Sequence, residues 1–456
     1  MNIHVVILAA GLGKRMFSSK PKVMHEVGGA PILSRVIDAA LGLQPAQIHV
    51  VIGSMSQIIK DTFSHLNLNF VVQNEQLGTG HAVHMALPYI PNDAQVLILS
   101  GDAPLLRIQT IKPLVEASLK TESLSLLVAN LENPFGLGRI VRDENKLITA
   151  IVEEKDASDK IKDIREIYTG ICCAKSSDLH NFIPLIKNRN AQSEYYLTDL
   201  IEMTVSAKKP ISSVEVTDYN DILGVNNRVQ LQLTERIFQS RMANELLLKG
   251  ATLADASRID VRGTIDLGQD VYIDVNNVFL GNVYLGDNST IEPNCVLKNV
   301  KIGKNCKIFS NSVLENCVVS DNCQIGPFAR IRPGTTIMDN CKIGNFVEVK
   351  NCQIAEGSKA NHLSYLGDST IGKDVNIGAG TITCNYDGAN KHKIVIEDGV
   401  FIGSDTQIVA PITIGKNATI GAGSTIRKDV PAEELTITTS TQKIIYGWKR
   451  PQKKDN

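Results

Sequence analysis

Residues 325–349 read IGPFARIRPGTTIMDNCKIGNFVEV, and a branched aliphatic residue occupies every sixth position of this stretch. These positions are Ile325, Ile331, Ile337, Ile343 and Val349. A globular fold has no reason to keep a six-residue period over many repeats. Such a period is typical of a parallel β-helix, in which each hexad forms one flat side of a coil and its aliphatic side chain stacks inward on neighbouring coils.

The hexad period extends through most of the chain after Gly250. Four cysteines each lie four residues after an inward aliphatic, at a place that requires a small side chain, and we interpret them as small hydrophobes: Cys295, Cys306, Cys323 and Cys341. The other inward positions are Leu267, Ile273, Phe279, Leu285, Ile291, Leu297, Ile302, Ile308, Leu314, Val319, Ile396, Ile402, Ile408, Ile414, Ile420 and Ile426.

Two breaks interrupt the hexads, and a solenoid often carries its functional loops at such breaks. EGSKANHLSYLGD contains His362 and leaves only Ala360 at the inward position, while a loop from about residue 383 to residue 393 leaves the period altogether. Cations, amides and phenols gather around these breaks and suit an anionic, hydroxyl-rich ligand: Arg332, Lys350, Tyr365, Asn376, Asn385 and Tyr386. Spacing alone leaves both a catalytic and a structural role open for His362.

The chain up to about residue 227 has a different pattern, in which short apolar runs alternate with helical stretches. The runs at 5–10, 48–53, 69–74, 95–102 and 124–129 read as strands, and 32–41 and 79–90 read as helices. This alternation predicts a mainly parallel, doubly wound α/β sheet. Helical spacing up to Gly250 predicts one linker helix. We therefore expect domains at 1–227 and 251–456, joined by a helix at 228–250.

The first strand leads directly into a glycine-rich turn, LAAGLGKRM, which ends in Lys14 and Arg15. Arg15 stands where a P-loop needs Ser or Thr, and Met16 stands at the third glycine of the dinucleotide fingerprint. Glycines still let backbone N–H groups approach an anion, and an arginine can fork onto phosphate oxygens. The turn and the later LILSGDAPL both follow strands, where α/β sheets bind ligands. A phosphate loop is predicted, with an ordinary strand-to-helix turn as the alternative.

Composition narrows the class of protein. The net charge of −1 favours neither nucleic acid nor a membrane surface. No apolar run approaches the roughly 18 residues of a membrane span, and the N-terminal run lacks the basic leader of a signal peptide. Nine cysteines without a C-x-x-C pair favour free thiols in a reducing cytoplasm.

With these motifs in place, the chain resembles a bacterial family of bifunctional N-acetylglucosamine-1-phosphate uridyltransferases and glucosamine-1-phosphate acetyltransferases. The resemblance covers nearly the whole length, from LAAGLGKRM to YGWKRP. It is carried by PKVMH, EQLGTGHA, GDAPLL, NAQSEYYLTD, GVNNR, IGPFARIRPG, SKANHLSYLGD and NIGAGTITCNYDGANK. It implies a Rossmann-like nucleotidyltransferase domain, a linker helix and a left-handed parallel β-helix of hexapeptide repeats.

For the first domain, the resemblance implies uridylyl transfer from UTP to N-acetylglucosamine 1-phosphate, with pyrophosphate leaving. Arg15 and Lys22 would neutralise phosphates, and Asp102 and Asn226 would hold Mg²⁺, which prefers such oxygen ligands. The remaining substrate contacts would be Leu8, Ala9, Ala10, Gly11, Ser100 and Gly101 around the nucleotide, Gln73, Gly78 and Thr79 at the uracil, and Gly138, Glu153 and Tyr168 at the sugar.

For the second domain, the resemblance implies acetyl transfer from acetyl-CoA to glucosamine 1-phosphate. The sugar amine is largely an ammonium ion at neutral pH, so a base must remove a proton, and His362 matches the family's base. Glu348 is a candidate for orienting it. Arg332, Lys350, Tyr365 and Asn376 match sugar-phosphate contacts, and Ala379, Asn385, Tyr386, Ser404 and Ala422 match acetyl-CoA contacts. Direct transfer is expected rather than an acetyl thioester on Cys384.

The family forms homotrimers, which we expect here. Three positions depart from its pattern: Lys14 replaces a usual Thr, Tyr168 a usual Asn, and Thr439 an Arg that meets coenzyme A. Two rival hypotheses remain at this point. One is a single-activity sugar-phosphate nucleotidyltransferase with a structural or regulatory β-helix, and the other is a non-catalytic scaffold. The stretches around His362 and Asn385 oppose the first, and LAAGLGKRM with GDAPLL opposes the second.

Overall fold

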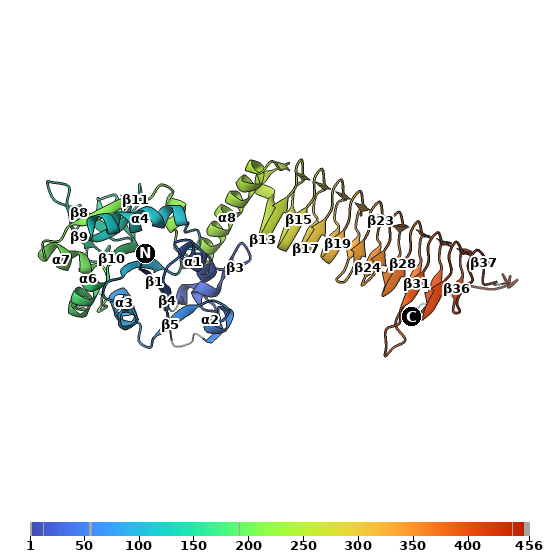
Figure 1. The fold of residues 1–456 in the computed structure, drawn as a ribbon, viewed down its shortest axis with the longest axis horizontal. Coiled ribbons are helices and arrows are strands. Elements are labelled where there is room, and N and C mark those ends of the chain that lie inside the picture. Colours follow the sequence, from blue (N-terminus) through green and yellow to red (C-terminus); the bar gives the residue numbers. More distant parts are fainter. Residues whose placement is uncertain (1, 12, 54–56, 191, 440, 451–456) are drawn as a thin grey trace. The chain divides into compact units, whose positions relative to one another are not determined.

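A computed structural model describes residues 2–11, 13–53, 57–190, 192–439 and 441–450. The chain forms two compact units, Met1–Phe238 and Gln239–Asn456, called unit 1 and unit 2 below (Figure 1). Unit 1 has the predicted Rossmann-like α/β fold, and unit 2 is the predicted parallel β-helix. The division between the units falls inside a helix, and the boundaries at 227 and 250 stay a prediction.

Unit 1 is built on a mixed sheet with the strand order β11-β7-β10-β6-β1-β4-β5, to which β8 and β9 are attached beside β10. The strands are β1 (Ile3–Ala9), β4 (Gln47–Gly53), β5 (Leu68–Gln73), β6 (Gln95–Ser100), β7 (Leu124–Asn130), β8 (Arg139–Arg142), β9 (Ile148–Val152), β10 (Glu166–Lys175) and β11 (Ile211–Glu215), with a separate hairpin of β2 (Glu26–Val27) and β3 (Ala30–Pro31). The helices are α1 (Ile32–Leu41), α2 (Gln57–Thr62), α3 (Thr79–Ala86), α4 (Ile108–Thr121), α5 (Asp159–Lys162), α6 (Ser176–Phe182) and α7 (Asp199–Ser206).

Strand β1 shows why this sheet is covered on both faces. Val5 and Ile7 are fully buried in one apolar cluster with residues of α1 and α4. Val6, between them, is fully buried in another cluster with residues of α3, α6 and α7. Because successive side chains of a strand point to opposite faces, a run of apolar residues requires helices on both sides. The unbroken VVIL run therefore fits a central strand, and β1 does lie between β4 and β6.

Parallel pairing brings the ends of β1, β4, β5 and β6 to one edge of the sheet (Figure 1). At this edge the N–H of Gly101, just after β6, donates to the carbonyl of Leu8 at 2.9 Å. A Cβ on Gly101 would lie 2.8 Å from that same carbonyl oxygen, so only glycine fits. The two motifs that follow β1 and β6 are thus fixed side by side.

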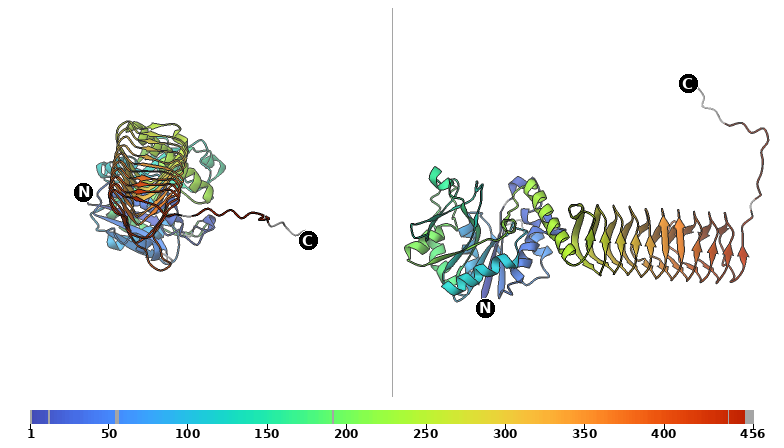
Figure 2. Two further views of the ribbon diagram at one scale, coloured as in Figure 1. Left: turned by 90° about the vertical axis from the view of Figure 1, so that its right-hand side faces the viewer. Right: turned by 90° about the horizontal axis from the view of Figure 1, so that it is seen from above.

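Unit 2 is a stack of coils whose strands pair in parallel from one coil to the next (Figure 2). One sheet contains β12 (Thr252–Leu253), β14 (Tyr272–Ile273), β16 (Thr290–Ile291), β18 (Lys307–Ile308), β20 (Gln324–Ile325), β23 (Lys342–Asn345), β26 (Lys359–His362), β29 (Asn376–Ile377), β32 (Phe401–Ile402), β35 (Thr419–Ile420) and β37 (Leu435–Thr436). The other contains β13 (Ile259–Leu267), β15 (Asn277–Leu285), β17 (Val296–Ile302), β19 (Val313–Val319), β21 (Arg330–Ile331), β22 (Thr336–Ile337), β24 (Glu348–Lys350), β25 (Gln353–Ile354), β27 (Tyr365–Gly367), β28 (Ser369–Ile371), β30 (Ile382–Cys384), β31 (Ile394–Ile396), β33 (Gln407–Val409), β34 (Ile412–Ile414) and β36 (Thr425–Ile426).

The hexad aliphatics form continuous inward columns. In one column Ile291, Ile308, Ile325 and Ile343 pair in register from coil to coil, and each is at most 1% exposed. The column then reaches Ala360, which pairs with Ile343 and is also buried, so the coil that carries His362 keeps the register with a smaller side chain. Cys306, Cys323 and Cys341 are likewise buried and unoxidised, as their interpretation as small hydrophobes requires.

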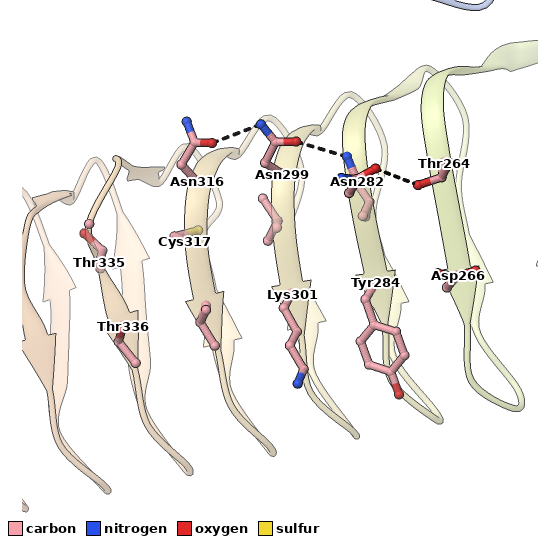
Figure 3. Close-up of a pocket in the computed structure, with 14 residues that line it drawn as sticks. Thr264, Asp266, Asn282, Tyr284, Asn299, Lys301, Asn316, Cys317, Thr335 and Thr336 are labelled. Carbon is pink, nitrogen blue, oxygen red and sulfur yellow. Dashed lines mark hydrogen bonds between the residues drawn. The ribbon is translucent and has the colours of Figure 1, made fainter. Parts of the chain in front are cut away.

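Asparagine makes the corners between the flat sides. Asn282, Asn299 and Asn316 lie on successive coils beside a shallow trough of about 910 Å³ (Figure 3). Asn299 and Asn316 have φ values of 51° and 45°, a left-handed conformation that asparagine adopts more readily than most residues. The amide of Asn299 donates to Oδ1 of Asn316 at 3.0 Å, so each corner side chain is also bonded to the next coil. The abundance of asparagine in this half follows from these corners.

Helix α8 (Arg228–Leu248) has residues in the cores of both units. In unit 1, Leu231, Ile237 and Phe238 pack in a cluster with Met16, Val27, Ile32, Leu105 and Val225. Glu235 accepts the N–H of Gly28 at 2.7 Å. In unit 2, Gln239 exchanges two hydrogen bonds with the backbone of Val261, and Ala243 and Leu246 are buried against the first coils. The predicted linker helix is therefore part of both folds. Within the described part of the chain, no helix is long and apolar enough to cross a membrane.

A buried histidine pair lies on β1 and β4 of unit 1. His4 Nδ1 is 2.9 Å from His49 Nε2, and His49 Nδ1 is 2.9 Å from the side-chain amide of Asn69. Burial, with a smaller contribution from His4, lowers the pKa of His49 to about 4. His49 is therefore neutral in the folded protein at pH 7 and stays neutral well below the pH at which it would protonate in the unfolded chain.

We predict an acid-sensitive free energy of unfolding for unit 1. The unfolded state binds a proton at His49 below about pH 6.5 and the folded state only near pH 4, so stability is complete above pH 6.5 and is lost as the pH falls towards 4. The loss at pH 5 should be about 2 kcal/mol. Urea unfolding of the wild type and of His49→Gln at pH 7.5 and pH 5 measures it. An equal pH dependence in both proteins would contradict this origin.

Candidate active sites

The predicted nucleotide contacts converge on one cavity of about 440 Å³ at the carboxyl edge of the unit 1 sheet. It is lined by residues that follow β1, β5 and β6, together with the start of α3. The predicted contacts in its wall are Leu8, Ala9, Ala10, Gly11, Lys22, Gln73, Gly78, Thr79, Ser100 and Asp102. Residues separated by up to 94 positions in sequence thus meet around one space that can hold a nucleotide.

A cluster of polar side chains closes this cavity at one end. The ammonium of Lys22 contacts the carboxylate of Asp102 and lies 3.2 Å from Oδ1 of Asn226. Ser100 donates to the other oxygen of Asp102 at 2.6 Å. Asp102 and Asn226 also line a second cavity of about 290 Å³ that adjoins the first at Ser100 and Asp102. The oxygens of Asp102 and Asn226 therefore point at a single cationic centre between two cavities.

This arrangement fits a divalent metal with few protein ligands. Among the residues that the structure describes, no three His, Cys, Asp or Glu side chains are grouped to hold a metal on their own. One carboxylate and one amide oxygen, with water and phosphate oxygens completing the shell, suit Mg²⁺, which usually keeps several non-protein ligands. Lys22 now supplies the positive charge that these two oxygens face.

The glycine-rich turn after β1 is held close to Lys22. Gly13 has φ 61°, and a Cβ there would lie 2.8 Å from the Cβ of Lys22. Glycine is thus required both by conformation and by space. Lys14 and Arg15 follow in a single 3₁₀ turn, and both side chains are exposed. Arg15 has no ion-pair or hydrogen-bond partner among the described residues, so its guanidinium is available to an anion.

The residues predicted for the sugar lie on β8, β9 and β10. Gly138 precedes β8, and a Cβ there would be 3.5 Å from both carboxylate oxygens of Glu153. Burial raises the pKa of Glu153, although Thr198 donates a hydrogen bond to it at 3.4 Å. The backbone N–H of Tyr168 donates to the carbonyl of Gly138, but its side chain is only 7% exposed and packs in the core. Its position gives the Tyr168 ring no open path to a sugar.

In unit 2, His362 lies at the exposed end of β26. Its Nδ1 is 3.1 Å from Oδ1 of Asn345, its register partner on β23. Because a carboxamide oxygen only accepts, Nδ1 carries a hydrogen, and in the neutral ring the lone pair is then on Nε2. Glu348 does not contact His362 in this structure: its carboxylate binds Arg332 at 2.7 Å. Asn345 is the residue that orients the ring.

Cations and amides surround the coil that carries His362. Glu348 pairs in register with Tyr365 on the next coil, and Arg332, which follows β21 one coil before Glu348, binds the Glu348 carboxylate. The ammonium of Lys391 lies beside that of Lys350 and lowers the pKa of Lys350. The predicted Asn385 is buried, and its amide binds the carboxylate of Asp368. Tyr386 is exposed in the loop, and its hydroxyl donates a hydrogen bond to the carbonyl of Gly388 at 2.6 Å. Asn376 is half-buried on β29.

The last predicted contacts occupy one corner of successive coils. Ala379, Ser404 and Ala422 each stand two residues after an inward isoleucine of β29, β32 and β35. The backbones there are closely packed, since a Cβ on Gly403 would lie 2.5 Å from the N atom of Ala422. Thr439 is exposed beyond β37 and is not part of this corner.

Three neighbouring residues were not predicted from sequence. Glu194 lies in the wall of the nucleotide cavity, Asn345 orients His362, and Lys391 lies beside Lys350. Glu194 and Lys391 belong to the quoted motifs NAQSEYYLTD and NIGAGTITCNYDGANK, which could have indicated them. The signal for Asn345 was its position alone: it lies 17 residues before His362, which is one coil.

Comparison with known proteins agrees with this division into two sites. Residues 5–145 match the family model described as MobA-like NTP transferase domain. Residues 265–299 and 393–428 match the bacterial transferase hexapeptide model, and residues 313–386 match the GMPPB C-terminal domain. The chain is therefore a transferase in which a nucleotidyltransferase domain is followed by a hexapeptide-repeat transferase domain.

Curated relatives span the whole chain. The chain is 55% identical to "Bifunctional protein GlmU" of Legionella pneumophila (strain Philadelphia 1) over all of both proteins. It is 51% identical to the protein of that name from Marinobacter nauticus and 48% identical to that from Cupriavidus pinatubonensis, over 99% of each chain. The chain belongs to the GlmU family, and it is a bifunctional uridyltransferase and acetyltransferase.

The contact between His362 and Asn345 leads to a prediction for acetyl transfer. Asn345→Ala removes the acceptor that fixes the hydrogen on Nδ1, so kcat should fall about tenfold, the equivalent of one well-placed hydrogen bond. Asn345→Asp keeps an acceptor and should retain more activity. Steady-state acetyl transfer measures both variants, and uridylyl transfer serves as the control. An unchanged kcat in Asn345→Ala would contradict the orienting role.

Proposed function

We propose that unit 2 acetylates glucosamine 1-phosphate from acetyl-CoA and that unit 1 then transfers a uridylyl group from UTP to the N-acetylglucosamine 1-phosphate so formed. The observation that supports this best is the polar cluster of Lys22, Asp102 and Asn226, which lies between the nucleotide cavity and the cavity that adjoins it. The residue assignments below follow the family resemblance, and the geometry of each site supports them.

In unit 1, the sugar phosphate attacks the α-phosphorus of UTP and pyrophosphate leaves. Negative charge grows on the bridging and leaving oxygens, and fixed cations and N–H donors lower the barrier most. Arg15, exposed and unpaired among the described residues, binds the leaving phosphates. Lys22 exchanges its contact with Asp102 for a phosphate oxygen, which leaves the oxygens of Asp102 and Asn226 to Mg²⁺. When bound, Mg²⁺ neutralises phosphate charge and holds the phosphates in place.

Base and sugar bind on opposite sides of this centre. Leu8, Ala9, Ala10 and Gly11 contact the nucleotide from the end of β1, and Gln73, Gly78 and Thr79 receive the uracil. Ser100 and Gly101 support Asp102. Gly138 and Glu153 bind the sugar, whereas the buried Tyr168 contributes indirectly, through the backbone N–H that holds the carbonyl of Gly138.

In unit 2, His362 removes a proton from the sugar ammonium, and the free amine attacks the thioester carbonyl. The C–S bond then breaks, and coenzyme A leaves as a thiolate that takes up the second proton lost by the nitrogen as the amide forms. Nε2 of His362 is available for the first step because Asn345 holds Nδ1. Arg332 and Lys350 bind the sugar phosphate, with Tyr365 and Asn376 beside them. Lys391 adds a third positive charge next to Lys350. Close ammonium groups repel each other, so a bound phosphate dianion stabilises this arrangement.

Acetyl-CoA lies along the corner formed by Ala379, Ser404 and Ala422, near Asn385 and Tyr386. Small side chains at this corner let the pantetheine approach the backbone. The acetyl group passes directly to the amine. Cys384 is half-buried, and its Sγ makes a weak contact of 4.0 Å with the carbonyl of Ile382, so no group near it among the described residues activates a thiolate.

We further propose a cytoplasmic homotrimer. Nine free cysteines fit the reducing cytoplasm. Lys350, His362 and Tyr386 are open at the surface of one chain, and a neighbouring copy would enclose them and exclude water from the thioester. Thr439, exposed beyond the last coil, offers coenzyme A only a neutral hydroxyl.

The two activities should be separable by mutation. Asp102→Ala should reduce uridylyl transfer at least a hundredfold, because a fixed charge at the reacting phosphate is lost, and it should leave acetyl transfer unchanged. His362→Ala should do the reverse, since removing a general base costs about 10²–10⁴. EDTA should stop only uridylyl transfer. Assays of both half-reactions on each sample measure this, and equal inhibition of both reactions by EDTA would refute the single metal site.

Truncation should separate assembly from uridylyl transfer. A chain ending after Lys249 keeps the packing of Leu231, Ile237 and Phe238 and should be a monomer with normal uridylyl transfer. A chain ending at Arg228 loses that packing and should unfold more easily and lose activity. Light scattering and thermal unfolding measure this. A monomeric full-length chain with full acetyl transfer would contradict the trimer.

A further inference from the structure

Arg228 connects parts of unit 1 that lie far apart in sequence, and nothing above assigns it a role. It is the first residue of α8 and stands two residues after Asn226. Its Nε donates to the carbonyl oxygen of Met16 at 3.1 Å, and its Nη1 lies 3.3 Å from Nδ1 of His25. One guanidinium thus binds two segments that are 212 and 203 positions away in the chain.

His25 must accept its hydrogen bond from Arg228. A guanidinium has only donors, so Nδ1 of His25 presents its lone pair, and in the neutral ring the hydrogen is then on Nε2. Burial, together with the positive charges of Arg228 and Lys20, lowers the pKa of His25, so the ring is neutral at pH 7. The direction of this contact is therefore fixed.

The other nitrogen of the His25 ring is buried without an acceptor. The residue is 6% exposed, and Nε2 is enclosed and has no hydrogen-bond partner among the described residues. A buried N–H in this state costs free energy that an apolar side chain of similar size would avoid. The hydrogen bond from Arg228 is the polar contact that distinguishes this imidazole from such a side chain.

Both partners of Arg228 adjoin residues assigned to the nucleotide site. Met16 directly follows Arg15 and ends the 3₁₀ turn after β1, with its side chain buried beneath that turn. His25 follows the short 3₁₀ turn that begins at Lys22, and its N–H donates to the carbonyl of Lys22 at 3.2 Å. Arg228 therefore binds directly behind the segments that present the two cations of the site.

We infer that Arg228 and His25 are positioning residues that hold the Lys14–Met16 turn in place, so that Arg15 meets the leaving phosphates of the nucleotide. This inference rests on the proposed function, in which Arg15 binds those phosphates. A single 3₁₀ turn is too short to fix an exposed side chain by itself. Arg228 binds its last carbonyl from outside, and His25 fixes the direction of the Arg228 guanidinium.

The test measures kcat/KM for UTP in uridylyl transfer by the full-length protein. Arg228→Lys keeps a positive charge but offers one nitrogen in place of two, and His25→Leu removes the acceptor. Each should lower kcat/KM about fivefold to tenfold, as for one hydrogen bond. His25→Asn places an oxygen near the Nδ1 position and should restore most of the activity. Gln232→Ala, at an exposed position one turn further along α8, should leave kcat/KM unchanged. Acetyl transfer should stay at the wild-type rate in all variants.

A double-mutant cycle with Arg15→Ala distinguishes positioning from a structural role. If Arg228 and His25 act through Arg15, adding Arg228→Lys or His25→Leu to Arg15→Ala should lower kcat/KM by less than about twofold. The same loss with and without Arg15 would overturn the inference. A lower midpoint of thermal unfolding with wild-type kcat/KM in the single variants would show a merely structural role and also overturn it.

Arg15→Ala by itself separates this inference from the assignment on which it rests. If Arg15→Ala loses uridylyl transfer while Arg228→Lys and His25→Leu keep it, Arg15 acts on the phosphates and the inference about its positioning is overturned. If Arg15→Ala keeps the wild-type kcat/KM, the assignment of Arg15 fails and the inference fails with it.

Discussion

The inward stacking of one side chain on its counterpart in the next coil is the constraint on which unit 2 depends. A coil has no core of its own, because its apolar side chains are buried only when another coil covers them. The register must therefore persist even where function changes the sequence. Ala360 illustrates this: the coil with His362 keeps its inward position and its pairing with Ile343, although the side chain is reduced to a methyl group. His362 is thereby presented at the exposed end of β26, on a coil that stays in register with its neighbours.

In unit 1, polar groups are held in fixed positions by the ends of the strands. The glycines at 13 and 101 allow approaches that any Cβ would prevent, and they bring the turn after β1 against Lys22 and the turn after β6 against Leu8. Polar side chains then meet where apolar strands stop. Asp102 illustrates the result, since Ser100 and Lys22 both donate to its carboxylate and the same Lys22 ammonium also binds the carboxamide oxygen of Asn226.

The features that follow from a repeating sequence pattern could be predicted. Those that follow from side-chain contacts between residues far apart in sequence could not. Six-residue spacing located the inward columns, and the strand–helix alternation located the sheet. The meeting of Lys22, Asp102 and Asn226 could be expected only from the family motifs. No local pattern predicts it, because Lys22 and Asn226 are 204 positions apart in sequence. Glu348 was the predicted partner of His362, yet its carboxylate binds Arg332, and the uncharged Asn345, one coil before His362, contacts the ring instead. Tyr168 lies on β10, for which no strand was predicted, and packing fixes the side of that strand that it faces.

The one-dimensional character of unit 2 has a consequence for how such a chain can change over generations. Equivalent corner residues in adjacent coils are 17 or 18 positions apart, as Asn299 and Asn316 or Asn276 and Asn294 are. Loss or duplication of a segment of that size preserves every vertical neighbour except at the junction. The number of coils between helix α8 and His362 can therefore change by whole turns, whereas a one-residue change within a strand would turn polar side chains into the interior. Differences of one residue occur instead at the corners, as the register shift between Leu280 and Val283 shows.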